Sequence, residues 1–172
     1  LVEIAAGRVT RIAQDGTKST ISAQGGGPNG LALGPDGYLY CCNNGGFLWH
    51  EETGHIRPVG QPPDYSGGRL EKIEPRTGAV QVLYESCSGH ALRGPNDLVI
   101  GRDGGIWFTD LGKVRARDRD HGFVYWGAPD GSRIEQVCGP FIGGANGISL
   151  SPDERTLYVA ETETARLWGF AV

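Results

Sequence analysis

Three asparagines occupy the same place in a short phrase that occurs three times in the chain. They are Asn29, Asn96 and Asn146, which are 67 and 50 residues apart. Each phrase closes on further polar side chains, namely Asn43 with Asn44, Asp110 and Glu161. Amide and carboxylate oxygens are hard donors that suit Ca²⁺, Mg²⁺ or Mn²⁺, and Zn²⁺ also accepts oxygen ligands. The residue types therefore indicate a divalent-metal site, provided that the fold brings the phrases together.

The same asparagines also have a purely structural interpretation. Asn before Gly, as at Asn29 and Asn146, is common in turns because it tolerates left-handed backbone geometry and bonds its own backbone. Repeats copy structural residues as readily as functional ones. The Asp-Gly turns at Asp15, Asp36 and Asp130 lie elsewhere in the pattern, and we assign them to structure alone.

The elements that must position these residues are β-hairpins. In each phrase (residues 28–40, 95–108 and 145–158) an apolar strand runs into a turn of Asp with Gly or Pro, and a second strand rich in aromatic or β-branched residues runs back. A second hairpin, with a polar turn, also recurs once in each repeat, at residues 7–21, 68–83 and 122–137. Residues 166–170 begin a further copy. Two hairpins in a repeat of about 50 residues make a four-stranded antiparallel sheet, which is typical of a propeller blade. The sequence predicts an all-β propeller.

The blades predict one partial domain over residues 1–172. Its parts are the end of one blade, a full blade, a second full blade and the start of a fourth, at residues 1–24, 27–86, 93–140 and 145–172. A Pro- and Gly-rich insertion from Gly54 to Gly67 lengthens the first repeat. Because propeller rings usually have at least four blades, we expect a fragment whose ring is completed by a companion chain or a second copy.

The propeller geometry predicts where the polar residues meet. The innermost strand of every blade lines the central channel, so residues just before equivalent innermost strands come together around the axis. We therefore expect Asn29, Asn96 and Asn146 at one face of the ring. The antiparallel return strand brings Asp110 and Glu161 back to that face.

Composition excludes several classes of protein. The 29 glycines and 10 prolines disfavour a helical bundle, and 38% hydrophobic with 21% charged residues disfavours disorder. A net charge of −4 of mixed sign predicts no nucleic-acid partner. No apolar run approaches the length of a membrane span, which predicts no membrane partner.

The four cysteines form neither a CxxC motif nor a zinc spacing. We expect reduced, mostly buried thiols and hence a cytoplasmic setting, with an oxidised, secreted protein as the alternative. Those cysteines are Cys41, Cys42, Cys87 and Cys138.

Four segments together carry a family resemblance. Residues 93–98 (RGPNDL) followed by 106–110 (IWFTD), with 145–153 (ANGISLSPD) and 157–162 (LYVAET), resemble the gluconolactonase and SMP-30 (regucalcin) family. The resemblance covers nearly the whole chain. It implies a six-bladed propeller that hydrolyses sugar lactones with one divalent metal ion in its channel, Ca²⁺ before Zn²⁺, Mg²⁺ or Mn²⁺.

The resemblance also implies roles for individual residues. Asn146 matches a metal ligand, and Asn96 matches a second channel asparagine that lies near the metal and contacts substrate or its water. We therefore take both Asn146 and Asn96 as candidate metal residues. Arg93 approximates a substrate-contacting arginine, although its spacing to Asn96 is one residue off the family pattern. Asn29 and Asp110, at the channel mouth, are further candidates for substrate binding.

Two residues of the family pattern have no counterpart in this sequence. The first metal-ligating Glu and the catalytic Asp would lie in blades before residue 1 and after residue 172, so we expect no catalytic residue here and no activity from this chain alone. Two other readings stay open. One is a propeller that binds a ligand or protein without chemistry, as NHL-type repeats do, and the other is a strictosidine-synthase-like enzyme. The phrase at Asn96 and Asp97 favours the lactonase.

Overall fold

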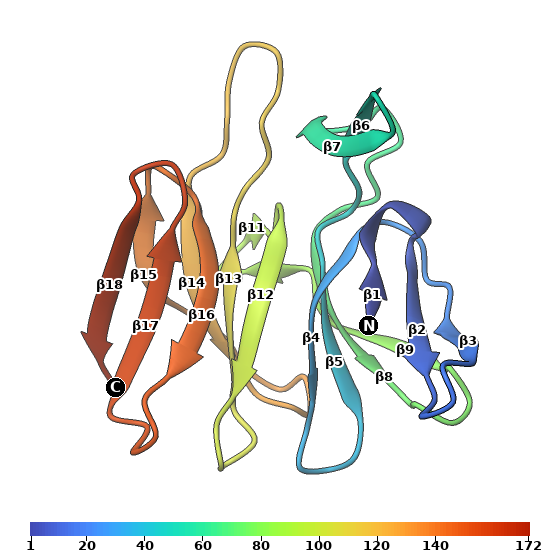
Figure 1. The fold of residues 1–172 in the computed structure, drawn as a ribbon. Helices are drawn as coiled ribbons and strands as arrows, with labels where there is room; N and C mark the ends of the chain where they lie inside the picture. The colour runs from blue at the N-terminus through green and yellow to red at the C-terminus, as the bar shows by residue number, and fades with distance from the viewer.

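The computed structural model describes residues 1–172 as a row of antiparallel sheets that stand side by side (Figure 1). The first sheet consists of β1 (Val2–Glu3), β2 (Arg8–Ile12) and β3 (Lys18–Ser22), with a 3-10 turn, η1 (Ile4–Ala6), after β1. The second consists of β4 (Pro28–Leu33), β5 (Leu39–Asn43), β8 (Arg69–Ile73) and β9 (Val80–Tyr84). The third consists of β12 (Pro95–Ile100), β13 (Ile106–Asp110), β14 (Gly122–Gly127) and β15 (Ile134–Phe141). The fourth consists of β16 (Ala145–Leu150), β17 (Thr156–Glu161) and β18 (Arg166–Ala171).

These sheets confirm the predicted all-β propeller architecture. Each asparagine phrase forms the first hairpin of its sheet, as β4–β5, β12–β13 and β16–β17. Strand β12 lies between β4 and β16, so the first strands of three sheets run side by side (Figure 1). The structure contains no helix with the length and apolarity that crossing a bilayer requires.

Each of these hairpins has an aspartate in its turn, and the side chain of that aspartate accepts a hydrogen bond from the turn backbone. Asp36 Oδ1 accepts a hydrogen bond from Tyr38 N at 3.2 Å, and Asp103 Oδ1 accepts one from Gly105 N at 2.9 Å. Asp153 does the same for Arg155 N. A side chain that bonds the backbone two residues on stabilises a tight turn. The structural interpretation of Asp36 is therefore confirmed.

The apolar core lies between neighbouring sheets. Between the second and third sheets, Tyr40, Leu70 and Phe108 are buried, and Phe108 stacks on Tyr125 with ring centroids 5.3 Å apart. A second cluster around Phe141, Leu157 and Val159 joins the third sheet to the fourth. Three cysteines are free and buried, and Cys138 is half-buried and also free, which fits the expected thiols.

The predicted insertion from Gly54 to Gly67 needs correction. The excursion contains an ordered hairpin, β6 (Leu48–Glu52) with β7 (His55–Gly60), which begins before Gly54. Its side chains are mostly exposed on both faces, so the alternation that marks a half-buried strand is missing from its sequence. A second small hairpin, β10 (Ser86–Cys87) with β11 (His90–Ala91), was also not predicted.

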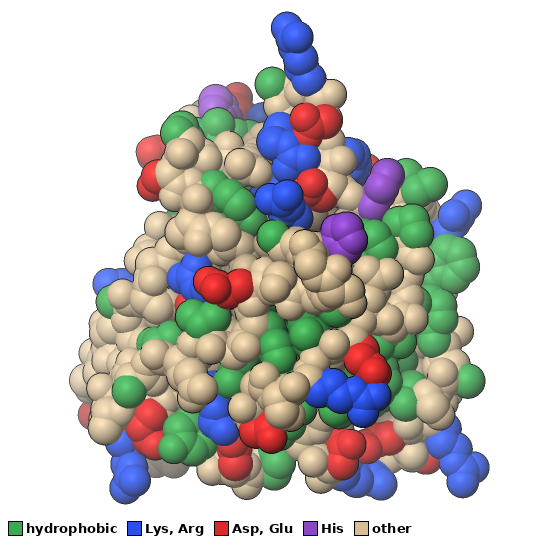
Figure 2. Space-filling view, turned by 180° about the vertical axis from the view of Figure 1, so that it is seen from behind, with side chains coloured by type: hydrophobic (Ala, Val, Ile, Leu, Met, Phe, Trp, Pro, Cys, Tyr) green, Lys and Arg blue, Asp and Glu red, His purple; other side chains and the backbone are tan.

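Charge is spread over the surface in both signs. Seen from behind, acidic and basic side chains lie close to one another near the lower edge and again near the top (Figure 2). Several form ion pairs, such as Lys72 Nζ with Asp36 Oδ2 at 2.8 Å.

Candidate functional site

The three predicted asparagines form one hydrogen-bonded row, called here the asparagine row. Asn29 Nδ2 donates to Asn96 Oδ1 at 2.5 Å, and Asn96 Nδ2 donates to Asn146 Oδ1 at 2.5 Å. Asn146 Nδ2 in turn donates to Thr162 Oγ1 at 2.8 Å. The structure thus brings the three repeats together at the asparagines, as the propeller geometry predicts.

An irregularity in each hairpin frees these side chains from the strand ladder. The pairing register shifts at the same place in all three, between Pro28 and Leu31 in the first, and between the equivalent residues of the other two. Such bulges re-aim a side chain that strict alternation would turn toward a sheet face. The repeated bulge therefore allows the asparagines to lie along a row that crosses from strand to strand.

Close approach of the first strands sets the spacing of the row. A Cβ on Gly30 would lie 2.6 Å from the Cα of Asp97, so β4 and β12 pack backbone against backbone here. On the other side, Thr109 Oγ1 donates to the Asn146 carbonyl at 2.5 Å, and Asp97 Oδ2 accepts from Ile148 N at 3.3 Å. The first contact holds β13 against β16, and the second holds β12 against β16.

The polar residues at the ends of the return strands accept hydrogen bonds from loop backbone and do not join the asparagine row. Asp110 Oδ1 accepts hydrogen bonds from Gly94 N at 2.6 Å and Gly112 N at 2.8 Å, and its Oδ2 accepts from Arg93 N at 2.7 Å. Asn43 Oδ1 and Glu161 Oε1 accept equivalent backbone bonds from Gly27 N and Gly143 N.

All of these return-strand side chains are buried, so each fastens the loop that enters its first strand. Burial raises the pKa of Asp110 above its usual value, against the opposing effect of its three backbone donors. The expected ring of amides and carboxylates is therefore two separate sets of side chains. One set is the asparagine row, and the other consists of the buried residues that hold loops, namely Asn43, Asp110 and Glu161. Contact of Asp110 with substrate stays a prediction.

Arg93 lies apart from the asparagine row. Its side chain is exposed and borders a hollow of about 400 Å³ shared with His90, Asp120 and His121. None of these four residues lines the hollows that Asn146 borders. The role of Arg93 in substrate binding also stays a prediction.

Two hollows meet at Asn146. One, of about 470 Å³, is lined by the three asparagines with Asp97. The other, of about 280 Å³, lies between Asn146, the β6–β7 hairpin and the loop from β13 to β14. In Figure 1 both that hairpin and that loop stand at the top, the end at which β4 and β12 begin.

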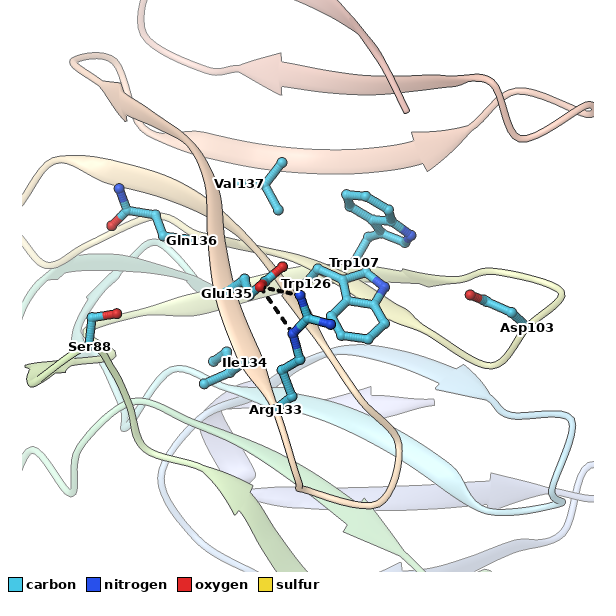
Figure 3. A pocket seen from close by; sticks show the side chains of 9 residues that line it. All are labelled: Ser88, Asp103, Trp107, Trp126, Arg133, Ile134, Glu135, Gln136 and Val137. Carbon is cyan, nitrogen blue, oxygen red and sulfur yellow. Dashed lines mark hydrogen bonds and ion pairs between the residues drawn. The ribbon is translucent and has the colours of Figure 1, made fainter.

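A larger hollow of about 860 Å³ lies on the third sheet (Figure 3). Trp107 and Trp126 are half-buried in its wall, and Arg133 and Glu135 bond each other there at 2.5 Å. The Arg133 guanidinium also lies 5.7 Å from the ring of Trp126. Because its central charges already satisfy one another, this hollow offers less to a reacting group than the asparagine row does.

The asparagine row fits part of a site for a hard divalent ion. The Oδ1 atoms of Asn96 and Asn146 each accept one hydrogen bond, which leaves each a second lone pair. No group of three or more His, Cys, Asp or Glu side chains in the chain could hold a metal ion. The row can therefore supply neutral oxygen ligands, and a complete site needs charged ligands in addition.

The sequence model of the SMP-30/Gluconolactonase/LRE-like region matches residues 1–172, the whole length of the chain. The chain belongs to this family. The family resemblance inferred from the asparagine phrases is confirmed.

Individual members of the SMP-30/gluconolactonase family are distant relatives of this chain. It is 25% identical over 155 residues to a gluconolactonase of Zymomonas mobilis, covering 85% of the chain and 37% of that protein. It is 30% identical over 169 residues to a lactonase drp35 of Staphylococcus haemolyticus, covering 97% of the chain and 45% of that protein. The chain thus spans less than half the length of these two relatives.

Solved structures agree with this assignment. A gluconolactonase from Xanthomonas campestris superposes with a TM-score of 0.73 at 27% identity, over 98% of this chain and 52% of that one. A streptogramin B lyase has a TM-score of 0.59 at 15% identity, which shows a shared fold alone.

Sequence reasoning missed the contact that fixes the β6–β7 hairpin. Lys113 Nζ donates to the Gly46 carbonyl at 2.6 Å and to Asn44 Oδ1 at 3.2 Å, and lies 4.0 Å from the centre of the Phe47 ring. Burial lowers the pKa of Lys113 to about 8. No local signal reveals this, since Lys113 stands at the edge of a charged loop and its partners are almost 70 residues away.

Proposed function

We propose that this protein hydrolyses a lactone, of the sugar-lactone class that gluconolactonases act on, at a site that includes the asparagine row. The observation that carries the proposal is the meeting of three amide side chains from three sheets beside two hollows. Membership of the SMP-30/gluconolactonase family and relatives named gluconolactonase and lactonase support it.

Within this proposal, Asn146 and Asn96 are ligands of one divalent ion, with Ca²⁺ placed before Mg²⁺, Mn²⁺ and Zn²⁺. Such an ion supplies Lewis-acid activation of a lactone carbonyl. Neutral amide ligands suit that task because they do not cancel the charge of the ion.

The residues of the asparagine row have different roles in positioning the ion and the substrate. Asn96 forms hydrogen bonds with both Asn29 and Asn146, so it orients Oδ1 of Asn146 toward the divalent ion. Asn29 ends the row and accepts no hydrogen bond on its own Oδ1, which leaves that atom free for a substrate hydroxyl. A carboxylate general base is required in addition, because the water that attacks the carbonyl must lose a proton.

We also propose that further blades, from a companion chain or a second copy, complete the ring and supply this carboxylate. The division of the polar residues supports this, because the carboxylates of Asp110 and Glu161 already serve buried loops.

Metal titration and two substitutions test the proposed function. In the full-length protein, Asn146→Ala should lower metal affinity and lactonase activity together, each by at least about tenfold. Asn96→Ala should lower turnover more than metal affinity, because Asn96 also orients Oδ1 of Asn146 through its side-chain hydrogen bond. Gln81→Ala, at an exposed position on β9, is the control. Hydrolysis of gluconolactone at the parental rate by both asparagine variants would contradict the assignment.

A further inference from the structure

A small apolar pocket adjoins the asparagine row. This is the hollow of about 280 Å³ that Asn146 borders together with Thr162. Most of the side chains in its wall are apolar, namely Phe47, Pro58, Val59, Leu111 and Val114. The remaining wall includes Arg119 and Glu163, whose side chains pair at 2.5 Å. Most of this wall therefore offers no hydrogen-bonding side chain to a ligand.

The pocket is built by two segments that are fastened together. The end of the β6–β7 hairpin bonds to the loop after β13 through Gln61 N and the Val114 carbonyl, 2.9 Å apart. Arg115 Nη1 donates to Gln61 Oε1 at 3.4 Å, and Lys113 Nζ holds the Gly46 carbonyl at the base of the hairpin. The apolar walls are therefore fixed next to Asn146 rather than carried on a free loop.

The chemistry of the walls selects one kind of ligand. An alkyl group placed there leaves water, which strengthens binding by about fourfold for each methylene group. A hydroxyl placed there loses its bonds to water and gains few in return, which weakens binding. A volume of about 280 Å³ is enough for a short alkyl chain but small for a drug-sized ligand.

We propose that this pocket receives an alkyl substituent of the lactone, and that Val59 and Val114 determine this specificity. The proposal rests on the proposed lactone hydrolysis, and among lactones it favours an alkyl substituent over the hydroxyl groups of the sugar-lactone class. A lactone whose carbonyl lies at Asn146 would project its substituent between the hairpin and the loop. The preferred substrate is then an alkyl-substituted lactone rather than a fully hydroxylated one.

A substrate series in the full-length protein tests the proposal. The series compares δ-valerolactone, δ-hexalactone, δ-octalactone and glucono-δ-lactone by kcat/KM. We expect kcat/KM to rise by about fourfold with each added methylene until the pocket is filled. The polyhydroxylated lactone should rank below the alkyl-substituted ones.

The double variant Val59→Thr with Val114→Thr assigns the preference to the pocket. Thr has nearly the shape of Val, and these positions are 43% and 48% exposed, so folding should be preserved. We expect the ratio of kcat/KM for δ-octalactone to that for δ-valerolactone to fall by about fourfold or more. The control is Val82→Thr on β9, which is 43% exposed and does not line the pocket. It should leave the ratio unchanged.

The outcomes separate this proposal from the proposed function. Hydrolysis of all the lactones with a flat series, or with an unchanged ratio in the double variant, overturns the pocket assignment and keeps lactone hydrolysis. If no lactone is hydrolysed, the proposed function fails, and calorimetric binding of δ-valerolactam and its 6-propyl derivative still tests the pocket. Tighter binding of the propyl compound that is lost in the double variant supports the pocket, and equal binding overturns it.

Discussion

At the scale of single residues, the side chain of Asp110 shows how one buried acceptor organises a loop. Its two oxygens accept hydrogen bonds from the backbone N–H groups of Arg93, Gly94 and Gly112, and the residue is 3% exposed. These residues lie directly before β12 and directly after β13. The loop that leads into Asn96 is therefore held by a residue outside the asparagine row.

Removing this carboxylate should cost far more stability than removing a turn aspartate. Asp110→Ala leaves three backbone donors without their partner, and we expect a loss of about 3 kcal/mol or more in the free energy of unfolding. Asp103→Ala removes the acceptor for Gly105 N in an exposed turn, and should cost less than about 1 kcal/mol. Urea unfolding of both variants measures the difference. Equal losses would show that Asp110 does not hold the loop.

At the scale of elements, the β6–β7 hairpin depends on a buried lysine. The pKa of Lys113 in the folded chain is about 8, because burial disfavours its charge more than nearby Asp110 and Asp120 favour it. In the unfolded chain a lysine has a pKa of about 10.4. Between these values the unfolded chain holds a proton that the folded chain has released, so stability rises with pH in this window.

Substitution of Lys113 should expose this pH dependence. The stability of the parent protein relative to Lys113→Met should increase from pH 8 to pH 10, by a total of up to about 3 kcal/mol. Urea midpoints at several pH values measure the increase. Lys18→Met, at an exposed position on β3, is the matched control for loss of a lysine. Parallel pH profiles for the parent and Lys113→Met would contradict the prediction.

Two equivalent glycines test the close packing of the first strands. A Cβ on Gly30, which follows Asn29, would lie 2.6 Å from the Cα of Asp97, whereas a Cβ on Gly147, which follows Asn146, would meet no atom closer than 3.7 Å. Gly30→Ala should therefore destabilise the fold by about 1 to 3 kcal/mol, because a backbone must move. Gly147→Ala should change stability by less than about 1 kcal/mol. Thermal unfolding compares them, and similar melting temperatures would refute the packing argument.

At the scale of the whole molecule, the core is distributed between sheets, so each sheet needs a neighbour on both faces. The fourth sheet has apolar side chains in the open, with Leu167 at 72%, Tyr158 at 41% and Trp168 at 38% exposed. Burying such residues against further blades would stabilise the assembly by about 25 cal/mol for each Å² removed from water.

The proposed completion of the ring predicts association of this chain. Sedimentation of the 172-residue chain should give a mass above 18.4 kDa, either as a self-associated species or with a companion chain. Leu167→Lys should weaken this association because it places a charge on the exposed face of β18. Leu48→Lys on β6, where Leu48 is 46% exposed, is the control. A stable, folded monomer of the unmodified chain would refute the proposal.

The sequence by itself determined the repeated hairpins of the main sheets and the place of the three asparagines. Turn chemistry is local, because Asp and Gly specify tight turns through their own backbone and side chain. The repeat then fixes equivalent positions in successive sheets, which is why Asn29, Asn96 and Asn146 could be placed together from the sequence. The family resemblance rests on the same phrases.

Only the tertiary structure decided what surrounds these asparagines. The loop-holding role of Asp110 depends on backbone donors of Arg93 and Gly94, and the hairpin is fixed by a lysine almost 70 residues away. The apolar pocket joins residues 47–60 to 111–119 and 143–163. Such contacts join segments whose local sequences carry no sign of one another, because burial and hydrogen bonding between them arise only when the sheets pack.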